Sequence, residues 1–250
     1  MEIERKKFQG VLNILSFNRH FYVIGFSVLF LICISYIIFP WPTTLFWLII
    51  GAFIYGLTMP LIVSAYVYDF SGYYNFDWLK KLKTNLLETN QIVNINAGFD
   101  ETSFILKKTL PNANLQVFDF YNTEQHTEPA IIRARKVSLV YPNTTQIKSN
   151  NIPVHDKTVD IIFLLSAAHE IRSHIERQNF LKECLRICKP DGKVIMIEHL
   201  RDIPNFFAFT FGFTHFFSRK TWKQSFKKSG FTSITEIKFT PFMSIFECYP

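Results

Sequence analysis

The chain has 250 residues and a formal net charge of +7, and 48% of its residues are hydrophobic. This length gives room for one full-sized domain with an appendage. The sequence contains no run of five basic residues, which disfavours a nucleic-acid-binding protein. Its four cysteines include no CxxC pair, so we predict no metal site and a reducing, cytosolic environment.

Two uncharged stretches near the N-terminus predict a transmembrane hairpin. Residues 21–39 and 45–68 are each long enough to cross a bilayer core as a helix, and the link PWPTT allows only a tight reversal. Lys and Arg flank the pair and are absent from the link, so we predict a multi-pass protein of the inner (cytoplasmic) membrane with both termini in the cytoplasm. The alternatives are a buried helical hairpin and a cleaved signal peptide, which the second span disfavours.

From about residue 75 the pattern alternates between strands and helices. Strands are predicted at 91–96, 114–119, 137–140, 158–165 and 193–198, and helices at 101–109, 128–135, 175–188 and 218–229, with a turn at 189–192. Two last strands, 232–239 and 243–248, suggest an antiparallel hairpin. The predicted fold is α/β: a Rossmann-like, doubly wound, mostly parallel sheet. Residues 1–74 form the membrane anchor in this interpretation, and residues 75–250 form the second domain.

Polar residues follow the predicted strands, where open parallel sheets bind ligands. Gly98 follows the first strand and allows a ligand to approach the backbone, while Asp119 ends the second strand and is suited to a ribose diol. A plain turn glycine and a helix-capping carboxylate are the alternatives. His169 and Glu170 follow the fourth strand, and His199 follows the fifth.

Three segments resemble the class I methyltransferases that use S-adenosylmethionine (SAM). They are VNINAGFDETS (93–103), NIPVHDKTVDIIFLLSAAHEI (151–171) and LKECLRICKPDGKVIMIEH (181–199). The last is the most specific, with a helix, a Lys-Pro-Asp-Gly turn and a strand. The resemblance is to methyltransferase type 11-like proteins and covers about residues 75–250. The stretches AAHEI and EHLRD, with two spans ahead of them, resemble a membrane-anchored bacterial subgroup.

The resemblance implies SAM as cofactor and a set of residues that hold it. This cofactor-binding set is Asn94, Asn96, Ala97, Gly98, Asp100, Glu101, Asp119, Phe120, Ser149, Asn150 and Leu165. The sequence departs from the family pattern, which usually has an acidic residue at Asn94 and glycines at Asn96 and Asp100. We expect Asp100 or Glu101 to replace the missing carboxylate opposite the SAM amino group.

The implied activity is in-line methyl transfer from SAM to a small acceptor. His169 is the first candidate base, and Glu170 would orient it or bind substrate. His199 and Glu198 are the second candidates, ahead of His215. A structural, hydrogen-bonding histidine is the alternative at each position. Seven Phe residues lie between 206 and 217. Three interpretations are open for them: a roof over an apolar pocket, a contact with the membrane, or a helix packed on the sheet.

With an anchor nearby, we expect a lipophilic acceptor such as a quinone, a lipid or a pigment, and no nucleic acid. The sequence leaves open the identity of the acceptor, the atom that is methylated and the oligomeric state. The main alternative is a degenerate methyltransferase fold that serves as a membrane interaction module. A nicotinamide-dependent reductase is disfavoured because the three-glycine fingerprint and a Tyr-x3-Lys pair are missing.

Overall fold

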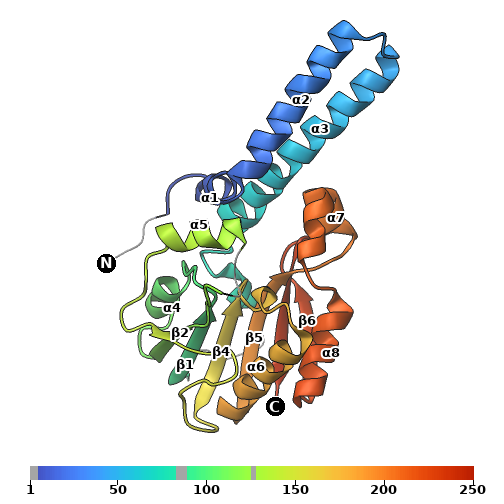
Figure 1. Ribbon diagram of the computed structural model, residues 1–250. Coiled ribbons are helices and arrows are strands. Elements are labelled where there is room, and N and C mark those ends of the chain that lie inside the picture. Colours follow the sequence, from blue (N-terminus) through green and yellow to red (C-terminus); the bar gives the residue numbers. More distant parts are fainter. Residues whose placement is uncertain (1–4, 83–88, 125–127) are drawn as a thin grey trace.

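The computed structural model describes residues 5–82, 89–124 and 128–250, and it contains a seven-stranded sheet below a long helical hairpin (Figure 1). The strand order is β3-β2-β1-β4-β5-β7-β6, and β7 runs antiparallel to both of its neighbours. The strands are β1 (Gln91–Asn96), β2 (Asn114–Asp119), β3 (Thr145–Gln146), β4 (Val159–Leu165), β5 (Cys188–His199), β6 (Ser233–Lys238) and β7 (Met243–Tyr249). The predicted Rossmann-like sheet with a terminal antiparallel hairpin is confirmed.

Helices cover both faces of the sheet because its central strands are apolar on both sides. On one face, α6 (His174–Ile187) and α8 (Arg219–Ser229) bury Phe180, Trp222 and Phe226 in one core cluster. On the other face, α4 (Ser103–Thr109) and η2 (Asp77–Lys81) bury Leu106 and Trp78 in a second cluster. The apolar central strands of the sheet are therefore shielded from water on both faces.

The hairpin consists of α2 (Arg19–Ile38) and α3 (Thr43–Ser64), and the π-helical turn η1 (Ala65–Phe70) extends α3 toward the sheet. Both helices are long and apolar enough to cross a membrane, and 0% and 11% of their apolar windows are buried. A core helix of a soluble protein is mostly buried, so this exposure argues against the buried-hairpin alternative.

Val63 and Val67, at the end of the hairpin, belong to the core cluster on the second face of the sheet. The hairpin is therefore packed onto the domain by its own helix rather than joined to it by a free linker. A short helix that the sequence did not reveal, α1 (Gln9–Phe17), packs against α3 and α5 (Pro129–Val137) at this junction. Two more elements, α7 (Ile203–Phe209) and η5 (Thr210–His215), lie beside the lower part of the hairpin (Figure 1).

Two local predictions differ from the structure. Residues 137–140 were expected to form a strand, but α5 ends at Val137 and the third strand is Thr145–Gln146. The run Val-Ser-Leu-Val is apolar yet exposed, so its hydrophobicity does not reflect a sheet position. The turn at 189–192 is absorbed into β5, where the register jumps from Cys188 to Lys193 opposite β4. Lys83, one of the flanking basic residues, lies outside the described residues.

Candidate functional site

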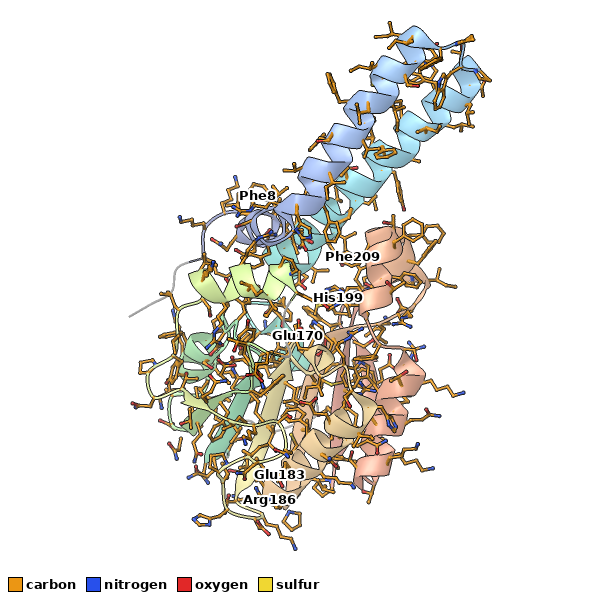
Figure 2. The ribbon with its side chains drawn as sticks, viewed as in Figure 1. Phe8, Glu170, Glu183, Arg186, His199 and Phe209 are labelled. Carbon is orange, nitrogen blue, oxygen red and sulfur yellow. The ribbon has the colours of Figure 1, made fainter. Side chains whose placement is uncertain are left out.

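The carboxyl ends of the parallel strands meet at the edge of the sheet that faces the hairpin. Glu170 and His199 lie at this edge, whereas Glu183 and Arg186 lie at the opposite end of the domain (Figure 2). The predicted location of the site, beyond the ends of the strands, therefore coincides with the base of the hairpin.

Gly98 and Asp119 lie side by side at this edge, since Asn96 pairs with Asp119 in the β1–β2 register. Gly98 has φ of +88°, a conformation that favours glycine, and a Cβ there would lie 2.9 Å from the nearest atoms of Tyr121 and Arg135. Asp119 accepts hydrogen bonds from the Tyr121 amide (2.8 Å) and from Arg135 Nη1 (2.6 Å).

Arg135, on α5, also stacks over the Tyr121 ring at 4.5 Å from its centroid. The guanidinium therefore occupies the space in front of Gly98 and Asp119 that the sequence assigned to a ribose. No motif points to Arg135, because it reaches this position only through the placement of α5 over the sheet edge. Its side chain is 40% exposed, so the group lies at the surface of the site rather than inside the core.

Three buried polar atoms next to the first strand have no hydrogen-bond partner among the described residues. They are Asn94 Oδ1, Asn96 Nδ2 and Asp100 Oδ2. The other side-chain atoms of these residues organise the turn: Asn96 Oδ1 accepts from the Gly98 amide, and Asp100 Oδ1 accepts from two amides at the start of α4. A buried polar atom without a partner is costly, so these two acceptors and one donor suit a polar ligand.

Glu101 has a different environment from Asp100. Its carboxylate accepts from Arg5 Nη1 (2.6 Å), the Tyr74 hydroxyl (2.6 Å) and Asn13 Nδ2 (3.3 Å). Burial, and then the charge of Glu101, raises the pKa of Tyr74 well above its usual value, so this phenol stays protonated and keeps donating. The N-terminal helix is thereby tied to the cavity wall, and Glu101 has its acceptor sites occupied by donors from this chain.

His169 sits between two carboxylates. Its Nδ1 contacts Glu198 Oε2 at 2.8 Å, and its Nε2 lies 3.4 Å from Glu170 Oε1. Burial acts to lower the pKa of His169, but the charges and hydrogen bonds of Glu198 and Glu170 outweigh it and raise the pKa to about 10. The imidazole is therefore a cation at neutral pH and has no lone pair with which to act as the predicted base.

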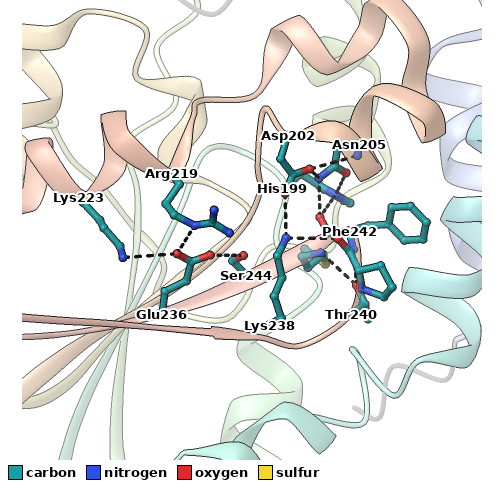
Figure 3. A network of polar contacts seen from close by, with 12 residues as sticks. His199, Asp202, Asn205, Arg219, Lys223, Glu236, Lys238, Thr240, Phe242 and Ser244 are labelled. Atoms are coloured by element: carbon teal, nitrogen blue, oxygen red, sulfur yellow. Dashed lines mark hydrogen bonds and ion pairs between the residues drawn. The ribbon is translucent and has the colours of Figure 1, made fainter.

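His199, in contrast to the cationic His169, is neutral. Its Nδ1 faces two acceptors, Asn205 Oδ1 (3.1 Å) and the Phe242 carbonyl (3.0 Å), so Nδ1 carries the proton (Figure 3). Nε2 is then free to accept from the Tyr68 hydroxyl at 2.9 Å. Burial, and to a smaller extent the His169 cation, lowers the pKa of His199 to about 4, although both acceptors work against this. His199 is a neutral, oriented imidazole.

His215, the third candidate, packs its ring edge-on against His169 with centroids 5.2 Å apart. Burial and the neighbouring His169 cation lower its pKa to about 4. One potential metal-ligating atom from each of His169, Glu170 and His215 lies within 4.8 Å of the other two. The sequence contains no metal-binding motif, so this grouping was not predicted. A metal here would have to displace the proton of His169, which the two carboxylates hold.

Ser166, directly after β4, has φ of +53° and lines the cavity described below. A non-glycine residue in this conformation is uncommon and is often found at functional sites. Its amide donates to the Ile197 carbonyl (2.9 Å) and its hydroxyl lies 3.3 Å from the Tyr73 hydroxyl, which fixes the conformation from both sides. Neither Ser166 nor Tyr73 was predicted from the sequence as part of the site.

One cavity of about 910 Å³ extends from the sheet edge to the hairpin, and several of these groups line it, whereas Gly98, Asp100, Asp119 and Arg135 lie outside its lining. Its inner wall contains Asn94, Asn96 and Ala97, and its middle contains Ser166, His169, Glu170 and His199. Its outer wall is formed by the hairpin residues Phe21, Tyr22, Gly56, Leu57 and Pro60 and by residues 209–212 and 214–216. The cavity therefore joins the polar strand ends directly to apolar helices.

The fold and the order of its elements match known proteins. Residues 110–196 match a family described as a methyltransferase domain. The chain is 26% identical over 147 residues to a demethylmenaquinone methyltransferase of Thermotoga maritima, a match that covers 58% of each chain and so spans less than two thirds of that relative. Residues 110–196 thus match a methyltransferase domain, and the chain is similar to SAM-dependent methyltransferases.

Solved structures agree on the fold. A SAM-dependent methyltransferase from Aquifex aeolicus has a TM-score of 0.50 at 21% identity and covers 72% of this chain and 93% of its own. Human N-acetylserotonin methyltransferase in complex with SAM has a TM-score of 0.51 at 12% identity, over 77% of this chain and 54% of its own. At such identities, these likenesses support the methyltransferase fold and carry no substrate assignment.

The residues of the methyltransferase domain fit SAM at its amino-acid end. SAM has an ammonium group, which donates, and a carboxylate, which accepts. The unpaired Asn94 Oδ1 and Asp100 Oδ2 suit the ammonium, and Asn96 Nδ2 suits the carboxylate. Asp100 therefore matches the expected replacement carboxylate better than Glu101 does. At the ribose end Asp119 is in place, but Arg135 has to turn away before a diol can reach it.

The remaining predicted residues divide into two groups. Ala97 and Leu165 line the cavity, and Phe120 lies beneath it in the core with its amide bound to the Asn96 carbonyl. Ser149 and Asn150 lie apart from the cavity: Ser149 donates to Glu176, and Asn150 lines a shallow depression near Arg186. Their contact with the cofactor stays a prediction.

Proposed function

We propose that this protein is a membrane-anchored SAM-dependent methyltransferase that methylates a lipophilic small molecule, such as a quinone, a lipid or a pigment-like polyene. The observation that carries the proposal is the cavity, because one continuous space touches both the SAM-type strand ends and the apolar hairpin. An acceptor that lies partly in apolar surroundings matches such a space better than a polar metabolite does.

The anchor is supported by the exposure and the charge pattern of the hairpin. Most of the apolar surface of α2 and α3 has no protein to cover it, which a soluble chain rarely tolerates. Arg19 begins α2, Lys80 and Lys81 follow α3, and the turn between the helices has no charged residue. By the positive-inside rule, this arrangement favours a methyltransferase domain in the cytoplasm at the inner membrane.

The chemistry needs alignment more than activation, because bound SAM supplies a methyl group on a good sulfonium leaving group. The residues around the middle of the cavity align the acceptor, which accounts for several kcal/mol of the barrier in such displacements. Ser166 and Tyr73 hold the end of β4 in its unusual conformation, and the aromatic wall excludes water.

We assign proton removal to His199 acting through Tyr68. An acceptor hydroxyl would donate its proton to the Tyr68 oxygen. At the same time the Tyr68 hydroxyl would pass its own proton to the lone pair of His199 Nε2. Because the pKa of His199 is lowered to about 4, this proton shift accompanies methyl transfer: the acceptor O–H bond breaks as its oxygen bonds to the methyl carbon and the bond from that carbon to sulfur breaks. The predicted order, with His169 first, is reversed in this proposal because His169 already carries its proton.

His169 then has an electrostatic role. Its imidazolium lines the cavity beside Glu170 and is held by the buried Glu198. The imidazolium offsets part of the negative charge of Glu198 and Glu170, which would otherwise oppose negative charge on an acceptor oxygen. The pair Tyr68–His199 and the cation His169 together favour a phenolic or enolic acceptor.

The quinone class has one specific support. The Thermotoga maritima relative is a demethylmenaquinone methyltransferase, whose acceptor belongs to the lipid-soluble quinones. The identity of 26% over 58% of the chain makes this a direction for the search rather than an assignment.

The decisive experiment incubates membranes that contain the protein with methyl-labelled SAM and then separates the lipid extract from the polar fraction. We expect the label in the lipid extract, and we expect Asp119→Ala membranes to contain much less of it. Label found only in the polar fraction would refute the lipophilic acceptor. Mass spectrometry of the labelled species identifies the acceptor.

The alternative, a fold without methyl transfer, has one observation in its favour. Arg135 forms an ion pair with Asp119 and fills the space in front of Gly98, as a side chain would in a site that has lost its ligand. Calorimetric titration with SAM and with S-adenosylhomocysteine separates the two proposals. Micromolar binding supports the enzyme, and no binding at millimolar ligand supports the interaction module.

A further inference from the structure

We propose that α7 and η5 (203–215), the aromatic element, are immersed in the cytoplasmic leaflet of the bilayer alongside α3. The mouth of the cavity then opens into the lipid rather than into the cytoplasm. This inference rests on the membrane anchor in the proposed function. It deepens that function by stating the route of the acceptor and a second surface that contacts lipid.

The first argument is depth. The Tyr55 hydroxyl donates to the Phe207 carbonyl at 2.6 Å, so α7 touches α3 at residue 55. Tyr55 comes 12 residues after Thr43, where α3 begins at the hairpin tip, and at about 1.5 Å per residue it lies about 18 Å from the tip. The hydrocarbon core is about 30 Å thick. If the tip reaches the far boundary, Phe207 lies about 12 Å inside the near one.

A tilted hairpin strengthens this argument, because tilt shortens the projection of each helix on the membrane normal. The hairpin residues that line the cavity follow the same arithmetic. Phe21 is 17 residues before the end of α2, and Pro60 is 17 residues after the start of α3, so both lie about 26 Å from the tip. The outer wall of the cavity is therefore within the leaflet as well.

The second argument is the exposed surface of the aromatic element. Phe211 is 87% exposed, Ile203 is 73% exposed and Phe207 is 57% exposed. Large apolar side chains gathered on one short segment are unfavourable in water and suit a lipid environment. The segment is also continuous with the apolar hairpin, since α3 packs against α7 (Figure 1).

The third argument is the position of two arginines at the base of the aromatic element. Arg201 donates to the Phe216 and Thr214 carbonyls, and Arg172 donates to the His215 carbonyl (2.6 Å). Both lie where the segment returns to the domain, which corresponds to the headgroup level in this placement. Guanidinium groups at that level are favoured by phosphate groups. The apolar tip and the cationic base thus match the profile of one leaflet.

The test uses the full chain in phosphatidylcholine–phosphatidylglycerol vesicles, with and without brominated acyl chains. Cys33→Ser removes the cysteine in the hairpin, and the three other cysteines are buried. A nitrobenzoxadiazole fluorophore is attached at Phe211→Cys, with Phe207→Cys as a second test position. Phe30→Cys in α2 is the lipid control, and Lys220→Cys at the start of α8 is the water control.

We expect brominated chains to quench both test positions to within twofold of Phe30→Cys, and aqueous iodide to quench only Lys220→Cys strongly. The inference is overturned if both test positions are quenched by iodide as Lys220→Cys is while Phe30→Cys is quenched by the brominated chains. If iodide also reaches Phe30→Cys, the anchor itself fails, and that result is distinguishable from the first. The second test position guards against one variant that does not fold.

Discussion

Removing the guanidinium of Arg135 tests the assignment of the ribose site. In the structure Arg135 competes for the carboxylate that the ribose needs, so Arg135→Ala is expected to bind SAM more tightly. The Arg135 side chain is 40% exposed and that of Asp119 is 9% exposed. Solvent screening therefore limits the ion pair to about 1 kcal/mol, which corresponds to about a fivefold tighter dissociation constant.

The assay is calorimetric titration of SAM into protein in detergent micelles. Lys136→Ala is the matched control, because it removes the same charge from the same helix at an exposed position. Asp119→Ala should weaken binding by about 10- to 150-fold, since hydrogen bonds to a charged group are worth about 1.5–3 kcal/mol. Fivefold weaker binding by Arg135→Ala would refute the reasoning and make Arg135 a cofactor contact.

Three further outcomes are expected. Tyr68→Phe should lower kcat by about 100-fold with little change in SAM affinity, because it interrupts the proton path. Tyr66→Phe is the control and should retain activity. Equal losses of kcat in the two variants would exclude the relay. Gly56→Phe should raise the KM for the acceptor about tenfold by filling the cavity, whereas Gly51→Phe, which has equal free space but lies outside it, should not; an unchanged KM would contradict the acceptor route. Because the folded pKa of His169 is about 10 and its ordinary value is 6.5, its stabilising contribution, a few kcal/mol, is complete below about pH 6.5 and is lost as the pH rises toward 10. Thermal unfolding between pH 7 and 10.5 should show this loss in the wild type and not in His169→Gln; parallel curves would contradict it.

Much of the fold follows from local pattern. The run at 158–165 is apolar on both faces and is a central strand, and the helix at 175–188 has the spacing of one buried face. The two uncharged stretches became α2 and α3. Gly98 and Asp119 were placed together because consecutive parallel strands end at one edge of the sheet. The predicted strand at 137–140 was wrong because a run of four residues with three apolar side chains does not reveal whether it is buried.

The roles of the histidines required the tertiary structure. A sequence shows that His169 and His199 follow strands, but their charge depends on which groups surround them after folding. Glu198, 29 residues away in the chain, makes His169 a cation, while Asn205 and the Phe242 carbonyl orient His199 as a neutral imidazole. The competing Arg135 is likewise visible only once α5 lies over the strand ends.

The sequence alone determined the layers of this protein, because strand and helix periodicity and the length of the uncharged stretches are properties of neighbouring residues. Only the tertiary structure decided that the hairpin helices form a wall of the same cavity as Asn94 and Asn96. It also decided which groups around that cavity are charged. Both depend on contacts between segments far apart in the chain, and a pKa or a cavity wall is set by such contacts rather than by local composition.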